Sequence, residues 1–232
     1  MTGINPLETT LDRVGRILSQ DYHIQVLCKG NECKTDGRTI WLPSLPEEVP
    51  ESLWQLLRGE IDHEVAHILF TDFGGKMQAF GQKWGAFGHD LLNVIEDVRV
   101  NYALARKYPG AGENIQHSLE AICKEHTHRL GDMPFPVRFL CALFLAGMGM
   151  AYDRYGKDAI CLVDQFSPET ETFKSLRSTE EACDVAESIL RRLPKNPPTG
   201  KHPAGQASGK QNPFPTQNQP PPGRPLGGAM VS

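Results

Sequence analysis

The feature that most constrains the fold is the sequence HEVAH at residues 63–67, in which two histidines stand four positions apart. Side chains at positions i and i+4 lie one above the other in an α-helix, so both imidazoles can reach one metal ion if this segment is helical. Apolar residues recur at helical spacing through the motif until a Gly-Gly pair ends the pattern. They are Leu53, Leu57, Ile61, Val65 and Ile68, before Gly74-Gly75. The sequence therefore predicts a long helix with one buried side, and Ser52 and Gln55 have capping-box spacing at its start.

The residues between the histidines indicate a chemistry. Glu64 follows His63 directly, so it lies beside the histidine face and can contact a metal-bound water without being a ligand. Zinc would lower the pKa of that water to about 7 and polarise a carbonyl, while the carboxylate transfers the proton. We therefore interpret His63 and His67 as Zn²⁺ ligands and Glu64 as the general base of a zinc metallopeptidase. The alternative is a pair of structural histidines on a polar helix face.

A catalytic zinc site takes a third protein ligand, and a second predicted helix, over about residues 90–107, offers two candidates. His89 and Glu96 are spaced to share a helix face, so spacing alone does not distinguish them. Glu96 lies among apolar residues, whereas His89 stands at the start of the helix after a glycine. We expect Glu96 to be the ligand and His89 to donate a hydrogen bond to the substrate oxyanion. Asp97 could orient an imidazole from outside the coordination sphere.

Residues 1–193 are predicted to form one α+β domain, which is mostly helical and has a small N-terminal sheet. Strands are expected at residues 22–28 and 38–42, with a hairpin turn at Asp36-Gly37. Residues 74–88 are rich in glycine and are expected to form a loop. Further helices are predicted at residues 7–18, 114–130, 137–155 and 179–193, the last with Ser178 and Glu181 in a capping box.

The composition changes at Pro194. Ten of the 18 prolines fall in residues 194–232, which contain few apolar side chains. Such a segment cannot bury enough surface to order itself, so we expect a disordered tail or linker, with a proline-rich docking motif as the alternative. This segment also holds four basic residues and no acidic one, so residues 1–193 carry a net charge of −8.

Charge and composition also exclude some function classes. The negative charge of residues 1–193 disfavours binding to the phosphates of nucleic acid, so we do not expect a nucleic-acid partner. Only the basic tail, residues 194–232, supports nucleic-acid binding as an alternative. The longest uncharged apolar stretch, residues 139–152, is too short for a membrane-spanning helix. Residues 1–20 do not resemble a signal peptide, and the six cysteines are scattered. We expect a cytoplasmic protein with reduced thiols.

Three segments together resemble a known family: TDGRTIWLP at residues 35–43, IDHEVAHILFTDF at 61–73 and LLNVIEDVRVNYALARKYPG at 91–110. They are similar to gluzincin-type, zincin-like metallopeptidase domains. More narrowly, they are similar to the peptidase-like region beside von Willebrand A modules in cobaltochelatase T-subunit-like proteins of bacteria and phages. The resemblance implies zinc ligation by His63, His67 and Glu96. It also implies that the strand Thr39–Leu42 is an edge along which an extended substrate pairs.

The sequence departs from the thermolysin-like pattern at Val100, where that pattern has an aspartate. Any carboxylate that orients a histidine from outside the coordination sphere must therefore come from another residue, such as Asp97. Two functions follow. The first is a zinc metallopeptidase that hydrolyses a protein or peptide substrate. The second is a catalytically silent zincin-like scaffold that binds a von Willebrand A or AAA+ partner in a chelatase-type assembly.

Overall fold

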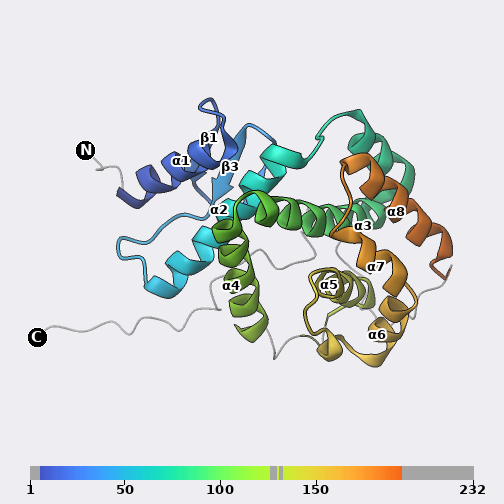
Figure 1. The fold of residues 1–232 in the computed structure, drawn as a ribbon. Helices are drawn as coiled ribbons and strands as arrows, with labels where there is room; N and C mark the ends of the chain where they lie inside the picture. Colours follow the sequence, from blue (N-terminus) through green and yellow to red (C-terminus); the bar gives the residue numbers. More distant parts are fainter. Residues whose placement is uncertain (1–5, 126–129, 131–132, 195–232) are drawn as a thin grey trace, which may run out of the picture.

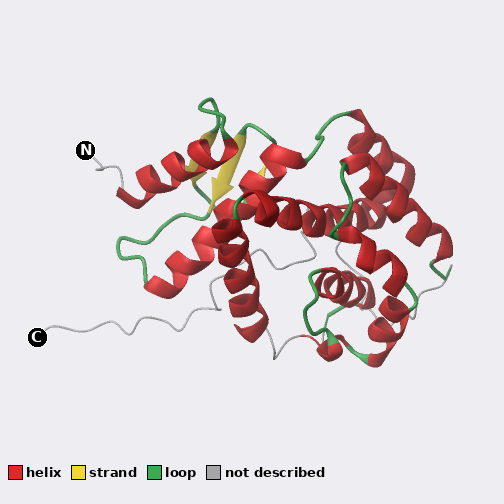
Figure 2. Ribbon diagram, viewed as in Figure 1, coloured by secondary structure: helices red, strands yellow, loops and turns green. Residues whose placement is uncertain are grey.

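The computed structural model describes residues 6–125, 130 and 133–194, and in these a small N-terminal sheet is followed mainly by helices joined by loops (Figures 1 and 2). The α-helices are α1 (Pro6–Ser19), α2 (Glu51–Phe70), α3 (Gly75–Lys107), α4 (Pro109–Glu125), α5 (Phe135–Gly147), α6 (Lys157–Asp164), α7 (Ser167–Phe173) and α8 (Thr179–Arg192). A short 3₁₀ helix, η2 (Asp153–Tyr155), follows α5. The expected mostly helical α+β class is confirmed.

The sheet has the strand order β1-β3-β2. β1 (Gln25–Cys28) is parallel to β3 (Thr39–Leu42), and β2 (Lys34–Thr35) is antiparallel to it. The turn at Asp36-Gly37 is confirmed, and Gly37 has a φ of 91°, which glycine adopts without steric cost. The turn joins β3 to the short β2, however, so a hairpin between the two expected strands is wrong: those strands, β1 and β3, are parallel. Because β3 lies between the other two strands, the expectation that it forms a free edge for substrate is wrong.

Helix α2 carries the HEVAH motif along 20 residues and buries Leu57, Ile61 and Val65, as its pattern predicts. Its expected capping box is wrong. The N-cap is Pro50, in an extended conformation and without a side-chain hydrogen bond, so Ser52 already lies inside the first turn. Proline has its own φ fixed and disfavours helix in the residue before it, which is sufficient to set this boundary.

Helix α3 begins at Gly75, so the loop expected over residues 74–88 is also wrong. Only Gly85 departs from helical geometry, with a φ of 67°. The segment is helical because apolar side chains recur every three or four residues between its glycines and pack on the larger core. These side chains are Met77, Phe80, Trp84 and Phe87.

The later helices follow the predictions in part. α8 and its Ser178 cap are confirmed, with the Ser178 hydroxyl accepting a hydrogen bond from the Glu181 backbone. The helix expected from residue 114 begins earlier, at Pro109, because proline suits the first turn of a helix. The helix is described as far as Glu125, and residues 126–129, before its expected end, lie outside the described residues, as does the Pro-rich tail after Pro194. The helix expected over residues 137–155 ends at Gly147, before Gly149 with its φ of 71°.

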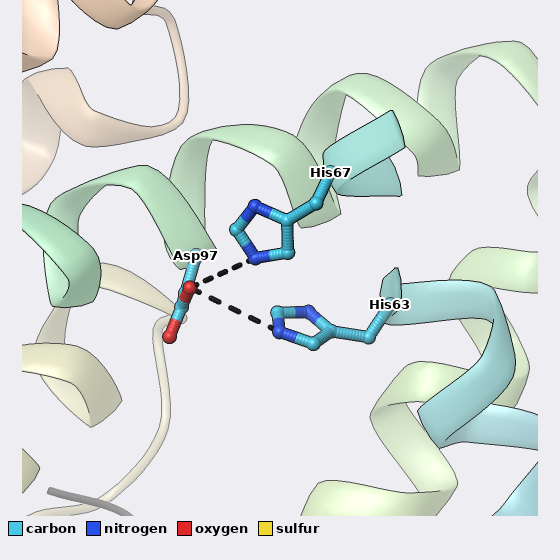
Figure 3. Close-up of side chains that lie close together, drawn as sticks. All are labelled: His63, His67 and Asp97. Carbon is cyan, nitrogen blue, oxygen red and sulfur yellow. Dashed lines mark hydrogen bonds and ion pairs between the residues drawn. The ribbon is translucent and has the colours of Figure 1, made fainter. Parts of the chain in front are cut away.

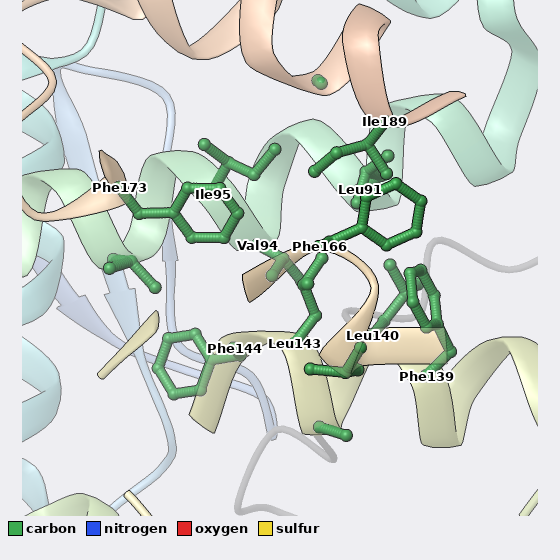
Figure 4. Close-up of a cluster of buried hydrophobic side chains, with 14 of the residues drawn as sticks. Leu91, Val94, Ile95, Phe139, Leu140, Leu143, Phe144, Phe166, Phe173 and Ile189 are labelled. Atoms are coloured by element: carbon green, nitrogen blue, oxygen red, sulfur yellow. The ribbon is translucent and has the colours of Figure 1, made fainter. Parts of the chain in front are cut away.

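Two hydrophobic cores meet at α3. The larger one packs α3 against α5, α7 and α8, and α6 joins this core by packing on α5 (Figure 4). The smaller one packs the sheet and α1 against α2, α4 and the end of α3. Leu91 and Ile95 face the larger core, whereas Val100 and Leu104 face the smaller. None of the helices in the described ranges is both long enough and apolar enough to span a membrane.

Candidate metal centre

The two motif histidines project from α2 on the same side. Their ring centroids are 4.7 Å apart and the ring planes are nearly perpendicular. This follows from the i, i+4 spacing on an uninterrupted helix, whose other side is fixed in the core by Ile61 and Val65. The helix thus presents two imidazoles as neighbouring groups.

Helix α3 adds a carboxylate. Asp97 Oδ1 lies 3.0 Å from His67 Nε2 and 3.9 Å from His63 Nε2 (Figure 3). One ligand atom from each of the three residues lies within 4.8 Å of the others. A tetrahedral Zn²⁺ ion about 2.0–2.1 Å from each ligand separates the ligand atoms by roughly 3.3 Å. The described residues therefore hold one group whose spacing fits a single divalent ion: His63, His67 and Asp97.

The other ring nitrogens are held by side-chain oxygens. His63 Nδ1 lies 2.8 Å from Asn101 Oδ1, which as an amide oxygen accepts its proton. His67 Nδ1 lies 2.9 Å from the Thr71 hydroxyl. A proton on Nδ1 leaves the Nε2 lone pair free to bind a metal, and such outer hydrogen bonds commonly fix metal-binding histidines. Both Nε2 atoms face Asp97, so a proton on each Nδ1 would leave both Nε2 lone pairs directed toward the position of a metal ion.

The charges of the cluster also suit a cation. Burial, together with His67, lowers the pKa of His63 and so favours the neutral, metal-binding form. Burial acts in the same direction on His67, but the hydrogen bond and the charge of Asp97 outweigh it and raise its pKa. The carboxylate that raises the pKa of His67 therefore lies next to Nε2, on the side where a metal ion would bind.

Glu64 lies close enough to the cluster for the charges of His67 and Asp97 to affect its pKa. It is buried, with 5% of its surface exposed. Burial raises the pKa of its carboxyl to about 8, with smaller effects from His67, Glu60 and Asp97. A carboxyl with a raised pKa beside a metal-binding group can hold or accept a proton near neutral pH.

Glu96, expected as the third ligand, is not brought into the cluster. Its carboxylate is fully buried and accepts two hydrogen bonds from Arg99, at 2.7 and 2.6 Å. Successive helix residues point about 100° apart, so Glu96 and Asp97 cannot both face α2. The face of α3 that meets the histidines carries Asp97 and Asn101, four residues apart.

His89, expected as an oxyanion donor, is also apart from the cluster. Its side chain is 49% exposed and its Nδ1 contacts the Asn93 amide at 3.1 Å. It precedes Asp97 by eight residues, or about 12 Å along the helix.

Two side chains that contact the histidines of the cluster were not anticipated from the sequence, Asn101 and Thr71. The sequence does contain a pattern that could have identified them, because each stands four residues after a residue of the cluster. Asn101 follows Asp97 on α3, and Thr71 follows His67 at the end of α2. Polar residues one turn after a metal ligand are placed to contact the ligand set.

Comparison with known proteins gives one family. The model of cobalamin biosynthesis protein CobT matches residues 3–130, more than half of the chain, and this range includes His63, His67 and Asp97. No curated protein and no solved structure gives a significant match. The resemblance to cobaltochelatase T-subunit-like proteins is confirmed, whereas its gluzincin part stays a prediction. Because this match covers more than half of the chain, including both helices that form the cluster, the chain belongs to the cobalamin biosynthesis protein CobT family.

Proposed function

We propose that this protein is a metal-binding, non-hydrolytic component of a cobaltochelatase-type assembly. The observation that carries the proposal is the family match over residues 3–130, since the family is defined by cobalamin biosynthesis. Within that assembly the chain would act as a scaffold for protein partners, with a von Willebrand A or AAA+ protein as the expected type. Cobalt would be the cargo of the assembly, delivered to a corrinoid ring.

We further propose that His63, His67 and Asp97 hold a resident Zn²⁺ ion. Two imidazoles and a carboxylate are a donor set that zinc accepts, and three protein ligands leave one position open. The spacing of the three ligand atoms and the Nδ1 contacts of both histidines support this assignment. Asp97 takes the place for which the sequence suggested Glu96.

A second candidate is peptide hydrolysis, and Glu64 is the observation that favours it. A scaffold has no physical need for a buried carboxyl beside a metal site, yet the pKa of Glu64 is raised to about 8 by its burial. Bound zinc would supply an activated water and a polarised carbonyl. Glu64 would then accept the proton and return it to the leaving amine.

Reconstitution tests the first proposal. The chain is mixed with the ATPase and ring-binding subunits of a cobaltochelatase, and Co²⁺ insertion into a metal-free corrinoid is followed by absorbance. We expect insertion to require the chain and to persist with Glu64→Gln, because a scaffold needs no general base. Insertion at the same rate without the chain would contradict the proposal.

The same Glu64→Gln variant tests hydrolysis. Zinc-loaded wild type and variant are incubated with unfolded casein, and new amino termini are quantified. If the second candidate is correct, the wild type cleaves casein, and the variant keeps its zinc but loses at least about 10²-fold in rate. If the scaffold proposal is correct, neither protein cleaves it.

A further inference from the structure

A buried polar network lies behind the candidate metal centre and includes Glu96. Glu96 and Arg99 form an ion pair in which the side chains are 0% and 2% exposed. The Thr179 hydroxyl, at the start of α8, donates to Glu96 Oε1 at 2.8 Å. These three residues come from two helices that pack on each other, α3 and α8. We call them the clamp.

The clamp holds the chain on both sides of Thr71. Arg99 donates a hydrogen bond of 2.7 Å to the Phe70 carbonyl. The Thr179 hydroxyl accepts a hydrogen bond of 2.9 Å from the Asp72 backbone. The residue before Thr71 and the residue after it are therefore each tied to a buried side chain.

Thr71 is also the residue that holds His67. Its hydroxyl lies 2.9 Å from His67 Nδ1, and its backbone N–H donates to the His67 carbonyl at 2.9 Å. Thr71 has an extended conformation, so it ends α2, and its side-chain position depends on how the following chain is held. The clamp therefore reaches the imidazole through hydrogen bonds to residues 70 and 72, through the backbone that joins these residues to Thr71, and through the hydrogen bond between Thr71 and His67.

From this geometry we infer that Thr179, acting with Glu96 and Arg99, is a positioning residue for the metal centre: the clamp fixes Thr71, and Thr71 fixes the ring of His67. The inference rests on the proposed metal site at His63, His67 and Asp97. A buried ion pair is weak evidence for stability alone, because apolar side chains of similar volume often serve as well. Apolar side chains cannot form the hydrogen bonds that hold Thr71, and with it the ring of His67, in one position.

Thr179 offers the cleanest substitution. Thr179→Val keeps the shape of the side chain but removes both hydrogen bonds, whereas Thr179→Ser keeps the hydroxyl. Thr170→Val is a matched control, since Thr170 is a buried threonine whose hydroxyl donates to the Ser167 carbonyl of its own helix, α7, at 2.9 Å. Zn²⁺ affinity is measured by chelator competition, and the visible spectrum of the Co²⁺-substituted protein reports the geometry of the ligands.

We expect Thr179→Val to weaken Zn²⁺ binding by roughly 10- to 100-fold, the range typical of lost outer hydrogen bonds, and to change the Co²⁺ spectrum. Thr179→Ser and Thr170→Val should match the wild type in both measurements. Thr71→Val tests the same route without disturbing the buried ion pair, and should reproduce the loss even if Thr179→Val folds poorly.

Two outcomes would overturn the inference, and they are distinguishable. If the wild type binds Zn²⁺ and Thr71→Val binds it equally well with an unchanged Co²⁺ spectrum, the route through Thr71 does not exist, while the metal site stands. If the wild type binds no Zn²⁺ at all, the proposed metal site fails and the clamp has nothing to position.

Discussion

At the scale of single residues, the direction of a side chain decides the site. The sequence identifies His63 and His67, because i, i+4 spacing on a helix leaves little freedom. It cannot choose between Glu96 and Asp97, which are neighbours on α3. That choice depends on how α3 is rotated against α2, and the buried contacts of Arg99 and Asn101 set this rotation.

This difference gives a prediction for the two acidic residues. Asp97→Ala should weaken Zn²⁺ binding by more than about 100-fold, beyond the usual effect of an outer contact, and leave the folded protein intact. Glu96→Ala should instead lower the free energy of unfolding by roughly 3–5 kcal/mol, because it leaves the charge of Arg99 buried without its partner. Chelator competition and urea unfolding measure the two effects. A folded Glu96→Ala protein that loses zinc, with zinc retained in Asp97→Ala, would return the ligand role to Glu96.

At the scale of elements, the sequence predicts helices better than it predicts their ends. α1, α2 and α8 follow their apolar periodicity closely. Residues 74–88 were expected to be a loop because of their glycines, yet the apolar spacing from Met77 to Phe87 was the stronger signal. The pairing of β1 with β3 depends on contacts far apart in sequence, which local patterns do not contain.

The contact between α2 and α4 gives a prediction of its own. A Cβ atom on Gly59 would lie 2.3 Å from Ser118 Cβ, so the two helices approach closely only because residue 59 has no side chain. Gly59→Ala should lower the free energy of unfolding by about 1–3 kcal/mol, the typical effect of overpacking. Gly110→Ala is the control: a Cβ there meets nothing, so a gain of about 0.4–1 kcal/mol is expected. If Gly59→Ala and Gly110→Ala change the free energy of urea unfolding equally, the contact between α2 and α4 can accommodate an added methyl group, which would contradict the prediction.

At the scale of the whole molecule, α3 joins two hydrophobic cores, of which Figure 4 shows part of the larger, and carries Asp97 of the candidate metal centre (Figure 3). The family match ends at residue 130, but Thr179, which belongs to the clamp, lies beyond it. The described part of the chain after residue 130 therefore contributes directly to the surroundings of the site. Local sequence patterns gave no sign of this, because the contact joins residues 83 positions apart.

The most direct test of the proposed centre is the metal content of the purified protein. After expression with zinc and gel filtration, elemental analysis should find about one Zn²⁺ per chain in the wild type, since three ligands from α2 and α3 surround one position. His67→Ala should lose most of that zinc, whereas His23→Ala, which changes an exposed histidine before β1, should retain it. A wild-type protein without stoichiometric metal, or a His67→Ala protein that keeps it, would contradict a metal centre at His63, His67 and Asp97.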